Sequence, residues 1–225
     1  MIKKINYNLA KKINLYNRLS NNSCLIVENC FSEKEMIKGK NELMNFLSEK
    51  KFEYKKNKKK KLFHRWDFEP KKAKFKRIMN STTFSLNDKK NFKNCLKLIR
   101  KGLLLKKNFI KNIKDKKNFS KEVFCRGSLY PSGGGYYQSH DDTFSHELIL
   151  DVIPLSIKNR DYYEGGFEVR IKKKKIMVDN YLKPGSIILL KPSIKHGVKK
   201  IDPNMKLNKR CTLGRYSLLS VLNVK

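Results

Sequence analysis

Eight short runs of strand-forming residues occupy the second half of the chain, and they constrain the fold more than any other feature. They lie between Glu122 and Val224, and turn signals such as 183–185 (Lys-Pro-Gly) and 202–204 (Asp-Pro-Asn) separate them. Short strands at this spacing favour a closed barrel or a jelly roll over a parallel sheet covered by helices. We therefore expect the chain from residue 123 onward to form a structure of this kind.

The first 122 residues follow a different pattern. A short apolar run at 24–27 predicts a short strand, and an S-x-x-E capping box at 32–35 followed by apolar residues at helical spacing predicts a helix after it. A second helical period covers 91–113. These patterns predict a mostly helical supporting region at 1–122, with some strand. Together with the β region it would form one integrated domain, mainly β with N-terminal helices (α+β).

The net charge of +33 is the most extreme property of the composition. Basic clusters bind the phosphates of nucleic acids, so a polyanionic partner is one interpretation. However, most of the basic residues are lysine, and asparagine, isoleucine and phenylalanine are also abundant. All four residues have A/T-rich codons, so codon bias explains much of the excess. We favour a solvated, lysine-coated surface, with the basic run at 55–61 as an exposed loop.

The five cysteines are scattered and form no C-x-x-C pair. This pattern argues against a disulfide framework and against a zinc ribbon, and it is typical of a reducing compartment. No apolar segment follows the basic N-terminus, and no apolar run is long enough to cross a bilayer. We therefore expect a soluble, cytoplasmic protein without a membrane partner.

The candidate catalytic residues begin in a stretch without lysine, residues 133–142 (GGGYYQSHDD). His140 and Asp142 are two residues apart in a predicted strand, so both side chains would point to one face. A third ligand would come from another strand, and His196 is the candidate. Two histidines and a carboxylate that leave open positions on the metal are the ligands associated with non-haem Fe(II) oxygenases.

We expect structural roles for four other residues. Asp141 would point to the opposite face of its strand. His146 lies beyond the predicted strand end, where a solvent-facing side chain is expected. His64 and Trp66 are best explained as part of a packed aromatic patch.

Several motifs make the chain resemble the Fe(II)/2-oxoglutarate-dependent dioxygenase superfamily, in particular its prolyl-hydroxylase-like branch. They are "LYPSGGGYYQSHDD", which contains the H-x-D pair, "YYEGGFEV", the distal His196, and "GRYSLL" at 214–219. The resemblance covers roughly residues 123–224. It implies a double-stranded β-helix, which is a jelly-roll or cupin-like barrel, as the catalytic core at 123–225.

The resemblance also implies roles for individual residues. His140, Asp142 and His196 match the iron ligands. Arg215 and Ser217 match the pair that holds the distal carboxylate of 2-oxoglutarate, and an arginine suits this task because it binds a carboxylate through two nitrogens.

Two further residues concern the cosubstrate. Tyr130 matches a tyrosine that often hydrogen-bonds it. Eighteen residues separate His196 from Arg215, more than is common in the family, so Arg210 is a rival anchor.

The implied cofactors are Fe(II), 2-oxoglutarate as cosubstrate and O2, with ascorbate as a further candidate. The implied reaction hydroxylates an unactivated C–H bond of a small molecule or a peptidyl side chain and releases succinate and CO2. One alternative is a nucleic-acid N-demethylase of the alkylation-repair type, although that branch usually has N-x-Y where this chain has residues 128–130 (Ser-Leu-Tyr). The other alternative is a cupin-like protein that binds a ligand without turnover.

Overall fold

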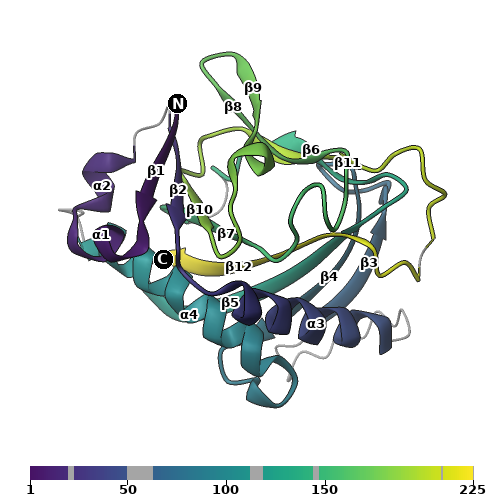
Figure 1. Ribbon diagram of the computed structural model, residues 1–225, viewed down its shortest axis with the longest axis horizontal. Helices are drawn as coiled ribbons and strands as arrows, with labels where there is room; N and C mark the ends of the chain where they lie inside the picture. Colours follow the sequence, from purple (N-terminus) through teal and green to yellow (C-terminus); the bar gives the residue numbers. More distant parts are fainter. Residues whose placement is uncertain (20–22, 50–62, 112–118, 144–146, 209, 225) are drawn as a thin grey trace.

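A computed structural model describes residues 1–225 except 20–22, 50–62, 112–118, 144–146, 209 and 225. The basic run at 55–61 and His146 therefore lie outside the described residues. In the part that is described, twelve strands form one strongly curled sheet (Figure 1). They are β1 (Ile2–Asn6), β2 (Cys24–Glu28), β3 (Phe63–Phe68), β4 (Arg77–Ser85), β5 (Phe119–Pro131), β6 (Gly135–His140), β7 (Leu150–Pro154), β8 (Gly166–Ile171), β9 (Lys174–Met177), β10 (Ile187–Leu190), β11 (His196–Ile201) and β12 (Gly214–Val224).

The strand order shows a jelly roll. Neighbouring strands run β1-β2-β10-β7-β12-β5-β4-β6-β11-β8-β9, and β3 pairs with β4. This continuous sheet folds into the two facing sheets of the jelly roll: β10-β7-β12-β5 lies in one and β6-β11-β8-β9 lies in the other, with β4 between them. Each of the eight predicted runs overlaps one of these strands. The predicted mainly β, jelly-roll fold is therefore confirmed.

Neighbouring side chains on the central strands enter two different apolar cores. In β10, Ile187 and Leu189 join one core, whereas Ile188 and Leu190 join the other. This division follows from the two-residue period of a strand. Strands such as "IILL" are continuously apolar because both of their faces are buried.

The two long helices cover one face of the β7-β12-β5-β4 part of the sheet, whereas the 3-10 helix packs against β8. The helices are α1 (Tyr7–Lys12), α2 (Leu15–Arg18), α3 (Glu33–Glu49), α4 (Lys89–Lys111) and the 3-10 helix η1 (Val178–Tyr181). Figure 1 shows α3 and α4 side by side along this face. The capping box begins α3 as predicted, because Ser32 N–H donates to Glu35 Oε2 (2.9 Å) and Glu35 N–H donates to Ser32 Oγ (3.2 Å). Among the described residues, no helix is both long enough and apolar enough to cross a membrane.

The first 122 residues also contribute four strands to the same sheet. Strand β2 pairs with β10, and β4 pairs with both β5 and β6. The sequence pattern indicated less strand here, because β4 buries Asn80, Ser81 and Thr82 where an apolar alternation would be the usual signal. Strand β4 joins the two sheets of the jelly roll, so this region helps to shape the interior.

Candidate metal centre

The β6–β11 ladder brings the two predicted histidine ligands together. His140 is the last residue of β6, His196 is the first of β11, and the two are paired directly across the ladder. Strand β6 ends before Asp142, although the sequence predicted that it would continue through this residue. A bond from Asp142 N–H to the Pro192 carbonyl (2.9 Å) holds the chain there.

The three ligand groups converge on one point. One donor atom from each of His140, Asp142 and His196 lies within 4.8 Å of the others. The Asp142 carboxylate faces both rings, with Oδ1 3.6 Å from His140 Nε2 and Oδ2 3.3 Å from His196 Nε2. This spacing is that of three donors arranged around a shared cation.

Backbone carbonyls select the imidazole tautomers. His140 Nδ1 lies 2.8 Å from the Gln138 carbonyl oxygen, and His196 Nδ1 lies 2.8 Å from the Ile194 carbonyl oxygen. Because a carbonyl oxygen only accepts, each Nδ1 carries the proton and donates it. In the neutral rings, both Nε2 lone pairs therefore face Asp142, as metal coordination requires.

The electrostatics suit metal binding. Burial and the neighbouring His196 ring lower the pKa of His140, so this imidazole resists protonation. Burial alone would raise the pKa of Asp142, but the contacts with His196 and His140 outweigh it and lower that pKa. A neutral imidazole and an ionised carboxylate are the forms that bind a metal. Imidazole and carboxylate without thiolate fit Fe(II) better than structural zinc.

All six predicted site residues line one cavity of about 90 Å³. They are Tyr130, His140, Asp142, His196, Arg215 and Ser217. The long β5–β12 ladder supplies another part of the cavity wall and pairs Arg215 with Tyr130. Arg210 is exposed in the segment between β11 and β12 and does not line this cavity.

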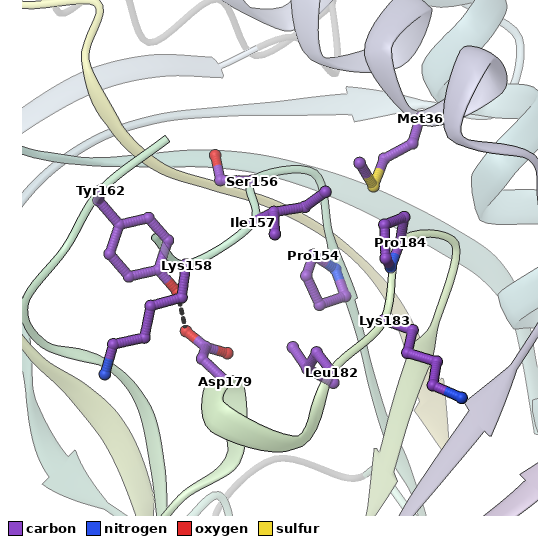
Figure 2. A pocket seen from close by; sticks show the side chains of 10 residues that line it. All are labelled: Met36, Pro154, Ser156, Ile157, Lys158, Tyr162, Asp179, Leu182, Lys183 and Pro184. Atoms are coloured by element: carbon purple, nitrogen blue, oxygen red, sulfur yellow. Dashed lines mark hydrogen bonds between the residues drawn. The ribbon is translucent and has the colours of Figure 1, made fainter. Parts of the chain in front are cut away.

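A buried carboxylate that the sequence analysis missed orients Arg215. Asp179, in η1, accepts hydrogen bonds from Arg215 Nε (2.7 Å) and Nη2 (3.2 Å) and from Phe167 N–H (2.8 Å). It also accepts a bond from the Tyr162 hydroxyl, which Figure 2 shows beside a second, smaller cavity of about 40 Å³. Although burial opposes it, Asp179 raises the pKa of Arg215, which therefore stays charged. In the sequence, Asp179 could have been noticed as an isolated acidic residue within the lysine-rich stretch 172–183.

No protein-family model and no curated protein sequence matches this chain. Solved structures do match it. A Pseudomonas putida prolyl-4-hydroxylase superposes with a TM-score of 0.65 at 11% identity, over 96% of this chain and 99% of that one. A Trichoplax adhaerens prolyl hydroxylase, solved with a hypoxia-inducible-factor peptide, gives 0.63 at 12% identity over 96% and 91%.

An Arabidopsis thaliana dioxygenase for auxin oxidation, solved with 2-oxoglutarate, gives a TM-score of 0.60 at 13% identity over 100% and 93%. The chain has the fold of the prolyl-hydroxylase-like 2-oxoglutarate dioxygenases. The three superpositions extend over 96% to 100% of this chain.

Two aromatic side chains that the sequence analysis did not select flank the His140 ring. Tyr137 stacks on the His140 ring with centroids 4.3 Å apart, and Phe75 lies 5.1 Å from the same ring. Tyr137 comes from β6 itself, whereas Phe75 comes from the segment between β3 and β4. Together they hold the His140 ring plane in place.

Asp141 and His64 lie elsewhere in the dioxygenase fold. The Asp141 carboxylate accepts a bond from Thr143 Oγ1 (2.6 Å) and does not line the cavity. His64 packs its ring edge against Phe46, 6.1 Å between centroids, in agreement with the predicted aromatic patch. All five cysteines are free.

Proposed function

We propose that the protein is an Fe(II)- and 2-oxoglutarate-dependent oxygenase that hydroxylates a C–H bond and releases succinate and CO2. The observation that carries this proposal is the convergence of His140, Asp142 and His196 in a cavity that Arg215 also lines. The fold of the solved dioxygenases supports it. The substrate would be a small molecule or a peptidyl side chain, and the neighbour solved with a peptide supports the second class.

Each residue of the site would have a defined task. His140, Asp142 and His196 would hold Fe(II), which supplies oxygen activation and positions for the cosubstrate. Arg215 donates hydrogen bonds to Asp179 through Nε and Nη2. Its Nη1 would bind the distal carboxylate of 2-oxoglutarate, together with Ser217. Burial raises the pKa of Tyr130 to about 12, so its hydroxyl stays protonated as a donor toward the cosubstrate.

The decisive experiment measures succinate. Purified protein would be incubated with Fe(II), 2-oxoglutarate, ascorbate and O2, and succinate release would be followed with and without pools of candidate substrates. We expect slow succinate release alone, faster release with a substrate, and none from Asp142→Asn. Formaldehyde among the products would indicate demethylation instead. No succinate with any pool, from protein that binds metal, would favour a binding protein without turnover.

A further inference from the structure

Arg126 is a second guanidinium in the cavity that contains the candidate metal ligands. It lies on the same face of β5 as Ser128 and Tyr130, and all three line the cavity. In the β5–β12 register Arg126 pairs with Leu219, four residues from the pair formed by Arg215 and Tyr130. Four residues of strand correspond to about 13 Å. The two guanidiniums therefore reach the cavity from well-separated points of the same wall.

The two arginines differ in their partners. Arg215 is bound by the carboxylate of Asp179. Arg126, by contrast, has no hydrogen bond or ion pair to any residue that the structure describes, although it is half-buried. A half-buried guanidinium that no carboxylate binds directly is costly, so an anion would be favoured at this point of the cavity.

The neighbouring acidic side chains, Asp67 and Asp142, are each committed to other positive groups. Arg65 and Arg77 share a single carboxylate, Asp67, at 3.0 and 2.6 Å, and the positive charges of Arg77 and Arg126 add to the burial that lowers the pKa of Arg65. Asp142 is close enough to feel the charge of Arg126. In the metal-loaded protein, however, Asp142 would be a ligand of the cation. Arg126 would then face positive charge on several sides.

We propose that Arg126 binds an oxyanion of the substrate, a carboxylate or a phosphate, and thereby positions the C–H bond that is hydroxylated. This inference rests on the proposed oxygenase function and adds to it the chemical class of the substrate. A guanidinium can bind either oxyanion through two parallel hydrogen bonds. The surplus positive charge of Arg65 and Arg77 would also draw anions toward the cavity.

Binding of small anions tests this without knowledge of the substrate. Protein saturated with Mn(II), which takes similar ligands, and with 2-oxoglutarate would be titrated by calorimetry with two matched pairs of probes. Benzoate against benzamide tests the carboxylate, and phenyl phosphate against phenol tests the phosphate. We expect wild type to bind at least one anion about tenfold more tightly than its neutral partner, a difference of about 1.4 kcal/mol.

The variants assign that preference to one residue. Arg126→Gln should lose it while still binding Mn(II) and 2-oxoglutarate, Arg126→Lys should keep part of it, and the exposed control Arg210→Gln should keep all of it. Equal or undetectable binding of anion and neutral probe by wild type, or an unchanged preference in Arg126→Gln, would overturn the inference alone. Loss of 2-oxoglutarate binding in Arg126→Gln would also overturn it, because Arg126 would then be a cosubstrate anchor. If wild type binds no 2-oxoglutarate, the proposed function fails, and the inference fails with it.

Discussion

The imidazole rings of His140 and His196 lie opposite each other across the β6–β11 ladder, with their centroids 4.5 Å apart. Fifty-five positions separate the two residues along the chain, so only the pairing of the two strands brings them together. Each ring is held by a hydrogen bond to the backbone carbonyl of the residue two positions earlier in the chain. The Asp142 carboxylate lies against both rings. The backbone thus prepares the donor set before any cation binds.

Asp142→Asn should weaken Mn(II) or Fe(II) binding by at least about tenfold, because it removes the anionic ligand from the site. The matched control is Asp141→Asn, which changes the adjacent carboxylate that bonds Thr143 instead. Titration calorimetry under anaerobic conditions would measure both variants. Equal affinities of the two variants would contradict the assignment of Asp142.

Arg215→Gln should weaken 2-oxoglutarate binding by more than tenfold, about 1.4 kcal/mol or more, whereas Arg210→Gln should leave it unchanged. Binding to the Mn(II)-loaded protein would be measured. Because Arg215→Gln also leaves the buried Asp179 carboxylate unpaired, it could unfold the protein. The double variant Arg215→Gln/Asp179→Asn removes both charges and separates lost binding from lost folding. Wild-type affinity in a folded double variant would refute the role of Arg215.

Lys106→Met should destabilise the protein by roughly 3–5 kcal/mol, because it removes one partner from a buried ion cluster. Lys106 Nζ lies 2.8 Å from Glu147 and 3.0 Å from Asp151, and it is fully buried where α4 packs on the sheet. Urea unfolding would measure the loss. The neighbouring and exposed Lys107→Met should change stability by less than about 0.5 kcal/mol. A small effect of Lys106→Met would show that the cluster contributes little.

The capping box of α3 should make stability depend on acid pH. A hydrogen bond donated by Lys97, and then one donated by the Ser32 N–H, lower the pKa of Glu35 from 4.5 to about 2. Because the folded pKa is the lower one, this stabilisation is present above pH 4.5 and is lost as the pH falls toward about 2.

Glu35→Gln keeps an acceptor for the Ser32 N–H but removes the charge that pairs with Lys97, so it should cost no more than about 0.5 kcal/mol near neutral pH and remove that part of the acid dependence. Thermal unfolding across this pH range would show it. Glu33→Gln, at an exposed position of the same helical turn, is the control. An identical pH profile in wild type and Glu35→Gln would rule out this role of the cap.

Much of the fold could be predicted because strand and turn signals are local. The eight β runs and the capping box depend on residues a few positions apart, and the structure contains all of them. The proximity of His140 and Asp142 could also be predicted, because the two residues are only two positions apart in the sequence. The substrate class could not be predicted in this way.

Other features depend on contacts between distant segments, which only the tertiary structure decided. Asp179 becomes important because folding places it against Arg215, and Arg126 because the β5–β12 register turns it into the cavity. The sequence did not predict β4 as a strand, because its buried polar residues show no apolar alternation and only its pairing with other strands defines it. Local sequence specifies which way a side chain points along its own strand, but strand pairing decides which other side chains it meets.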